Sequence, residues 1–249
     1  MQEFPSQWES WNPVTGCTKV SAGCAHCYAE RFAERWRGIA GHPYEHGFDL
    51  RLHPERLDRP VHWKKPRRVF VESMGDLFHE DVPDDFVREV FRVMAAVDRH
   101  VYLILTKRHE RLWALSPSLP WPRQIFMGVT VEGPGYVQRA DALRQVPAAV
   151  RWISAEPLLG PLDALDLTGI DWVAAGGESG PERRPPRVEW VRGIRDDCAA
   201  QGVAFTFKQW GGTSAGSNGR LLDGREWREE PRPGAGGVRW EQAKLWDEA

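Results

Sequence analysis

The chain has 249 residues, a formal net charge of −2, 41% hydrophobic residues and 27% charged residues. This balance is typical of a globular domain and excludes a disordered chain, while the small net charge excludes a general attraction to nucleic acid. No run of residues approaches the ~20 consecutive apolar positions of a membrane-spanning helix.

The first residues lack the basic start and apolar run of a signal peptide, so we expect a cytoplasmic protein. A short strand is expected just before Cys17, and Cys17, Cys24 and Cys27 then share one short loop. The fourth cysteine, Cys198, is far away in sequence and occupies a helical core position. Clustered cysteines in an otherwise cysteine-poor chain indicate a metal site and not a disulfide framework.

Two kinds of metal site fit this loop. Three thiolates can hold three irons of a [4Fe–4S] cluster and leave the fourth iron open to a ligand, whereas a cluster that only carries electrons normally has four cysteine ligands. A structural zinc ion would need a fourth protein ligand. His26 lies between two of the cysteines, which makes it an awkward ligand, so the better candidates are His42, His46 and His53. We favour the iron–sulfur cluster.

Beyond the loop, residues 29–36 predict an amphipathic helix with Phe32 and Trp36 four residues apart, and residues 39–66 predict an irregular inserted loop. Short apolar runs then alternate with helical patterns, which predicts a parallel sheet covered on both sides. We expect an α/β barrel similar to the TIM barrel, complete or partial, with an open doubly wound sheet as the second choice. The predicted strands are 69–71, 101–105, 125–131, 151–155, 172–175 and 203–207, and the predicted helices are 84–98, 135–146 and 188–201.

The end of the chain has a different character. Residues 212–249 are rich in glycine and proline and predict a turn-rich appendage, with a tight hairpin around Asp223 and Gly224. We therefore expect residues 1–211 to form the barrel and residues 212–249 to be attached to it.

Polar residues follow almost every predicted strand. Reactive residues of α/β barrels lie at the carboxyl ends of the strands, so these side chains predict a polar, charge-balanced pocket there. Any one of them could instead be the solvated start of a loop. The set comprises Asp76, Lys107, Arg108, Glu132, Glu156, Glu178 and Lys208, of which Lys107, Glu132, Glu156 and Lys208 are the catalytic candidates.

The most specific strand end is Gly176-Gly177-Glu178. Glycines after a strand let the backbone approach a ligand closely, and their N–H groups can bind an anion. Glu178 could then accept a hydrogen bond from an amine or a hydroxyl group. These three residues are predicted to bind a small-molecule cofactor.

A second function class is a nucleic-acid-binding or repair protein whose metal is structural. Two basic segments, residues 64–68 and 183–187, and 13 tryptophans would supply phosphate contacts and stacking surfaces. The same segments are equally consistent with solvated loops. The two functions merge in an enzyme that acts on a nucleotide or on a base in nucleic acid.

Several motifs together resemble one family, the phage gene-product 37/68 family of three-cysteine proteins found in phages and bacteria. The resemblance spans nearly the whole chain. It is carried by the cysteine loop with Trp11-Asn12-Pro13, Gly75-Asp76-Leu77-Phe78, Leu105-Thr106-Lys107-Arg108, Gly128-Val129-Thr130, Ser154-Ala155-Glu156-Pro157-Leu158, Gly176-Gly177-Glu178-Ser179-Gly180 and Phe207-Lys208-Gln209-Trp210-Gly211.

That family in turn looks like a divergent relative of the radical S-adenosylmethionine (SAM) enzymes. The resemblance implies an enzyme with a [4Fe–4S] cluster on Cys17, Cys24 and Cys27, SAM on the open iron, and a reductant protein as partner. The cysteine spacing here is C-x6-C-x2-C in place of C-x3-C-x2-C. His26 replaces the aromatic residue that precedes the third cysteine, and Tyr28 follows that cysteine as a cofactor-binding candidate.

The resemblance also places the motif that holds the SAM amine after the second strand. In this chain Met74-Gly75-Asp76 occupies that place, whereas the literal Gly176-Gly177-Glu178 comes several strands later. The resemblance therefore implies that Asp76, Glu178 or both contact the cofactor.

Overall fold

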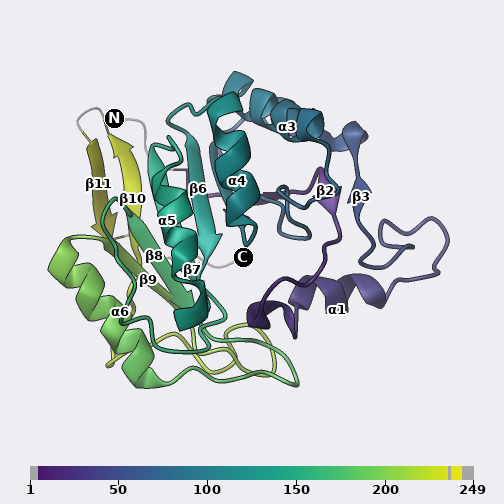
Figure 1. The fold of residues 1–249 in the computed structure, drawn as a ribbon. Helices are drawn as coiled ribbons and strands as arrows, with labels where there is room; N and C mark the ends of the chain where they lie inside the picture. The colour runs from purple at the N-terminus through teal and green to yellow at the C-terminus, as the bar shows by residue number, and fades with distance from the viewer. Residues whose placement is uncertain (1–4, 235–236, 243–249) are drawn as a thin grey trace.

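Seven parallel strands form one sheet in the computed structural model, which describes residues 5–234 and 237–242. The strands lie side by side in the sheet in the same order in which they occur along the chain. The sheet curls into a half-barrel (Figure 1). A doubly wound sheet reverses its strand order at a switch point, so this order excludes our second choice. The strands are β1 (Trp8–Trp11), β4 (Arg68–Val71), β5 (Val101–Thr106), β6 (Ile125–Thr130), β7 (Val150–Ala155), β8 (Trp172–Gly176) and β9 (Ala204–Gln209).

Four helices cover the outer face of the half-barrel (Figure 1). Their apolar residues and the outward-facing strand residues form one continuous core. The predictions for α3 and α6 are confirmed, α5 is shorter than predicted, and α4 was not predicted. The bounds are α3 (Asp84–Ala96), α4 (His109–Leu115), α5 (Gln138–Arg144) and α6 (Val188–Gln201), with short 3-10 turns η3 (Ser116–Ser118) and η4 (Pro134–Tyr136).

The inner face of the half-barrel carries a second, smaller apolar cluster to which no helix contributes. Trp152 and Trp172 stack there with ring centroids 5.1 Å apart. A Cβ atom at Gly128 would lie 2.4 Å from the Trp152 ring, so only glycine leaves room for this indole. Aromatic rings thus fill the inner face in the amino-terminal halves of β6, β7 and β8, and polar residues follow toward the carboxyl ends of the strands.

The N-terminal region differs from the sequence prediction in two respects. The strand that joins the sheet is β1, whereas the short strand directly before Cys17, β2 (Val14–Thr15), pairs antiparallel with β3 (Arg51–Leu52) outside the sheet. The helix α1 (Tyr28–Glu34) ends before Trp36, and the rings of Phe32 and Trp36 are exposed and pack on each other. Residues 39–66 are mostly irregular as predicted and include β3, η2 (Pro54–Arg56) and α2 (Arg59–His62). The short turn η1 (Ala22–Cys24) lies within the cysteine segment.

The predicted hairpin around Asp223 and Gly224 is present, and both residues have positive φ. It is followed by a second hairpin of β10 (Glu229–Gly234) and β11 (Gly237–Gln242). The appendage packs on β9, since the Phe207 amide donates to the Trp227 carbonyl at 2.9 Å. The Arg68 guanidinium also pairs with Glu230 at 2.6 Å. Residues 243–249 of the predicted appendage lie outside the described residues. Within the part that is described, no helix has the length and apolar character needed to cross a membrane.

Candidate functional site

The cysteine loop, defined here as residues 16–27, follows β2 and begins in contact with the segment after β4. The Gly16 amide donates to the Met74 carbonyl at 2.9 Å, and Gly16 forms a parallel bridge with Gly75. Gly16 has φ +83°, and a Cβ atom there would lie 2.2 Å from the Asp49 carbonyl oxygen. Glycine is therefore required where the chain turns into the loop.

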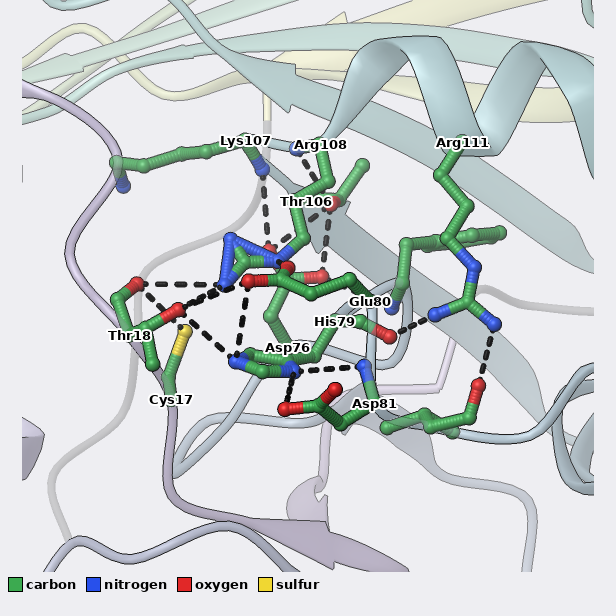
Figure 2. Close-up of polar contacts among 12 residues, drawn as sticks. Cys17, Thr18, Asp76, His79, Glu80, Asp81, Thr106, Lys107, Arg108 and Arg111 are labelled. Atoms are coloured by element: carbon green, nitrogen blue, oxygen red, sulfur yellow. Dashed lines mark hydrogen bonds and ion pairs between the residues drawn. The ribbon is translucent and has the colours of Figure 1, made fainter.

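Side chains from three strand ends hold the loop in place. After β5, Arg108 Nη2 donates to Thr18 Oγ1 at 2.7 Å (Figure 2). After β6, the Tyr136 hydroxyl oxygen accepts a hydrogen bond from the Ala22 amide at 2.9 Å. After β8, Arg184 Nη2 donates to the Ala22 carbonyl at 3.0 Å. The cysteine loop therefore lies at the carboxyl end of the half-barrel, where the sequence predicts the reactive residues.

Glu132 lies beneath the same loop. Its side chain is fully buried, it accepts a hydrogen bond from Ser21 Oγ, and its other oxygen is 2.7 Å from Arg139 Nη1. A Cβ atom at Gly23 would lie only 2.6 Å from Glu132 Oε1, so the loop backbone rests directly on the carboxylate. We expected Glu132 to shape a substrate pocket, and the structure instead places it as a buried support of the cysteine loop.

All three cysteines of the loop are half-buried free thiols. Cys17 Sγ is 3.3 Å from the Thr18 carbonyl, and Cys24 Sγ is 3.5 Å from Ser21 Oγ. Burial raises the pKa of the Cys17 thiol to about 12; Asp76, Cys24 and Cys27 add to this effect and Arg108 opposes it. Cys24 and Cys27 therefore lie close enough to Cys17 to interact with it electrostatically. Among residues 5–234 and 237–242, no three His, Cys, Asp or Glu side chains converge closely enough to hold a single metal ion.

The histidines considered as zinc ligands contact other groups. His53 Nε2 is 2.9 Å from Thr15 Oγ1, and its Nδ1 is 3.0 Å from Glu55. The His42 ring stacks on Trp36 with centroids 4.1 Å apart. His46 lies 3.0 Å from Glu45. Within the described residues, none of these rings joins the three cysteines in a ligand set.

Asp76 lies close to Cys17 but is already occupied by hydrogen bonds from the chain (Figure 2). Its carboxylate accepts from Thr106 Oγ1 at 2.7 Å, from the Phe78 amide at 3.0 Å and from the Lys107 amide at 3.3 Å. These bonds join the segment after β4 to the end of β5. Asp76 therefore positions two strand ends beside the cysteine loop.

The motif Gly176-Gly177-Glu178 is also packed against the chain itself. A Cβ atom at Gly176 would lie 2.6 Å from Glu156 Oε1, and one at Gly177 would lie 2.4 Å from the Trp210 carbonyl oxygen. Glu178 is buried and accepts hydrogen bonds from the Arg184 guanidinium and amide. Burial alone would raise its pKa, but the bonds from Arg184 hold the pKa of Glu178 below its usual value. The same Arg184 binds the cysteine loop, so Glu178 supports the loop through it.

The remaining candidates are more open to solvent. Lys208 Nζ and Glu156 form an ion pair in which the lysine side chain is 51% exposed, and Gln209 Nε2 donates to the same carboxylate at 3.2 Å. Tyr28 is exposed, and its hydroxyl donates to the Ser73 carbonyl at 2.5 Å. Lys107 is half-buried, and its Nζ donates to Thr130 Oγ1 at 3.3 Å. These residues are the ones at the rim that a ligand can reach.

Four residues of the site were missed by the sequence analysis: Ser21, Tyr136, Arg139 and Arg184. Ser21 and Arg184 lie in segments that we discussed, but the contacts by which they hold the loop, Ser21 with Glu132 and Arg184 with Ala22, join residues more than 100 positions apart. Arg139 is a buried cation inside the amphipathic helix α5, and a charged residue at a core position of such a helix is a usable signal.

Glu72, directly after β4, is a further buried carboxyl group that the sequence analysis did not single out. It has φ +64° and accepts the Val14 amide at 3.0 Å, so it holds β2 beside β4. Desolvation raises its pKa well above the usual value; the Val14 hydrogen bond and Arg56 oppose this, and Asp76 adds to it.

This environment predicts a pH-dependent loss of stability. Above the unfolded-state pKa of about 4.3, the folded state retains a proton that the unfolded state releases, so the free energy of unfolding falls as pH rises, by about 1.4 kcal/mol per pH unit at most. We expect Glu72→Gln, which keeps the acceptor for Val14, to remove this decline and to be more stable than the wild type at neutral pH. Urea unfolding of both proteins between pH 4.5 and 8 measures the free energy of unfolding as a function of pH. If the two proteins lost stability in parallel as pH rises, the prediction would be contradicted.

Comparison with known proteins identifies a family for this chain. The model of the family described as Protein of unknown function (DUF5131) matches residues 6–231, which include the cysteine loop and the whole half-barrel, and the chain belongs to that family. No curated protein and no solved structure matches the chain.

Proposed function

We propose that this member of the DUF5131 family is an iron–sulfur enzyme that holds one [4Fe–4S] cluster through Cys17, Cys24 and Cys27 and uses SAM. One observation carries the proposal. Side chains from the ends of β5, β6 and β8 hold the three-cysteine loop at the carboxyl end of a half-barrel. In α/β barrels this end is where reactive residues lie. The finer assignment of the fold, a partial barrel of the radical SAM type, is part of the same proposal.

The donor set fits such a cluster. Three thiols lie in one loop, and the fourth cysteine, Cys198, is buried in α6 and is no part of that loop. Arg108 lies beside Cys17 and is buried, and its Nη1 has no hydrogen-bond partner among the described residues. An unpaired cationic N–H group next to a thiol suits a site that gains negative charge when thiolates and sulfide assemble there.

When bound, the cluster would supply the electron that cleaves SAM into methionine and a 5′-deoxyadenosyl radical. The chain's own residues would hold the site in place. Glu132 supports Ser21 and Gly23, and Glu178 orients Arg184 on the Ala22 carbonyl. The rim residues open to solvent, Lys107, Glu156 and Lys208, would contact the substrate, and Tyr28 would contact the cofactor. The substrate class we propose is a nucleotide or a nucleic-acid base, with a separate protein as reductant.

The test is electron paramagnetic resonance of protein purified without oxygen, reconstituted with iron and sulfide, and reduced. We expect a cubane signal that shifts when SAM is added. A cubane signal indifferent to SAM would overturn the SAM assignment and leave an iron–sulfur protein. No cluster, with about one tightly bound zinc per chain instead, would overturn the proposal in favour of a nucleic-acid-binding protein with a structural metal.

A further inference from the structure

A cavity of about 420 Å³ lies on the rim between the cysteine loop and the starts of α4 and α5. Val20 of the loop borders it on one side, Lys107, Arg108 and His109 on another, and Tyr136 with Arg139 on a third. Its volume is within the range of small-molecule binding sites, about 300–1,000 Å³. Lys107, which was proposed above to contact a nucleotide substrate, lines this cavity, so the inference below rests on that proposed substrate class and asks which part of the substrate the cavity binds.

The cavity wall carries more positive than negative charge. Four Lys or Arg residues and two glutamates line it. Two of the cations are already engaged. Arg139 pairs with Glu132. Arg111 donates to the His79 carbonyl (Figure 2) and to the Val82 carbonyl, and it pairs with Asp84. These two arginines therefore shape the wall more than they attract a ligand.

Lys107 is the cation that the wall leaves without a counter-charge. It is half-buried, its Nζ donates only to Thr130 Oγ1 at 3.3 Å, and it forms no ion pair with any residue in 5–234 or 237–242. Arg108, next in sequence, pairs with Glu80 through Nε at 3.0 Å, while its buried Nη1 has no hydrogen-bond partner among those residues. An anion in the cavity would give this ammonium group the charge-assisted hydrogen bond that no carboxylate of the wall supplies.

We infer that this cavity binds the phosphate group of a mononucleotide-sized ligand. A phosphate monoester carries close to two negative charges and three acceptor oxygens, which matches a wall with several N–H donors and one unneutralised lysine. The rest of such a ligand would lie beside Val20 and Tyr136, next to the cysteine loop. The inference does not depend on the cluster, because no cavity residue is one of the three cysteines.

The test measures binding by calorimetry on protein as purified and again after reconstitution, with inorganic phosphate, adenosine 5′-monophosphate and adenosine as probes. We expect saturable binding of the first two and none of adenosine. Lys107→Gln should weaken nucleotide binding at least tenfold and Lys107→Arg should largely restore it. Lys65→Gln removes the same charge at an exposed position outside the cavity and should leave binding unchanged.

Three results would overturn the inference. The first is no saturable binding of phosphate or nucleotide. The second is equal weakening by Lys107→Gln and Lys65→Gln, which would indicate general electrostatic attraction. The third is Lys107-dependent binding of a single-stranded oligonucleotide with no binding of the mononucleotide, which would assign the cavity to a polymer. Because the binding expected of the protein as purified requires no cluster, its failure is distinguishable from failure of the proposed iron–sulfur function.

Discussion

Replacement of Cys24 by alanine is expected to abolish the iron–sulfur cluster. A cubane held by three thiolates already has one iron without a protein ligand, and loss of a second ligand leaves too few bonds to retain it. Iron and sulfide analysis after anaerobic reconstitution, together with the reduced electron paramagnetic resonance spectrum, measures the effect. The same result is expected for Cys17→Ala and Cys27→Ala.

Cys198→Ala is the matched control, because it makes the same chemical change at a cysteine outside the loop. Cys198 is fully buried in α6, and burial raises the pKa of its thiol, so it behaves as a small core residue. We expect this variant to keep its full cluster content and to lose about 1 kcal/mol of stability. A Cys24→Ala protein with the iron content of the wild type would remove Cys24 from the ligand set.

Glu132→Ala is expected to have the largest effect on stability. The carboxylate is fully buried between Arg139 and the cysteine loop, so its removal leaves a buried guanidinium unpaired and Ser21 without its acceptor. Breaking a buried ion pair in this way costs about 3–5 kcal/mol. We expect a corresponding fall in the free energy of unfolding in urea and, because the loop loses its support, weaker retention of the cluster.

Glu156→Ala provides the comparison. Glu156 forms an ion pair with Lys208 on the same rim, and the Lys208 side chain is open to solvent. That pair should contribute no more than about 1 kcal/mol. If Glu132→Ala does not fold, Glu132→Gln keeps an acceptor for Ser21 and should give folded protein with reduced cluster content. A Glu132→Ala variant within 1 kcal/mol of the wild type, or as mild as Glu156→Ala, would show that the loop does not depend on this carboxylate.

Elements with a strong local signal could be predicted from the sequence. The runs at 101–105 and 172–175 became buried strands because continuous apolar residues are stable only in a sheet covered on both faces. The helix at 188–201 was predicted with its exact bounds, since Gly202 ends it in the left-handed conformation. The helix α4 was missed, although it is as long as α1 and α5, and the first strand was misplaced because β1 and β2 are both very short.

Within the site, the sequence predicted where the polar residues lie better than it predicted which residues they contact. Polar residues that follow parallel strands must meet at one edge of the sheet, so the grouping of Lys107, Glu156 and Lys208 on the rim follows from the strand pattern alone. The partners of the carboxylates do not follow from it. Asp76 binds Thr106 and Glu132 binds Ser21, and these partners are 30 and 111 positions apart, beyond the reach of any local pattern.

By itself, the sequence determined that the chain forms an α/β sheet of parallel strands with three clustered cysteines at the start. Those features depend on apolar periodicity and on residue spacing, which are local properties. Only the tertiary structure decided that the sheet curls in unbroken order into a half-barrel, and that Glu132 and Arg184 hold the cysteine loop. The strand order depends on which strands pair, and the loop contacts join residues more than 100 positions apart, so both require the whole core to be packed first.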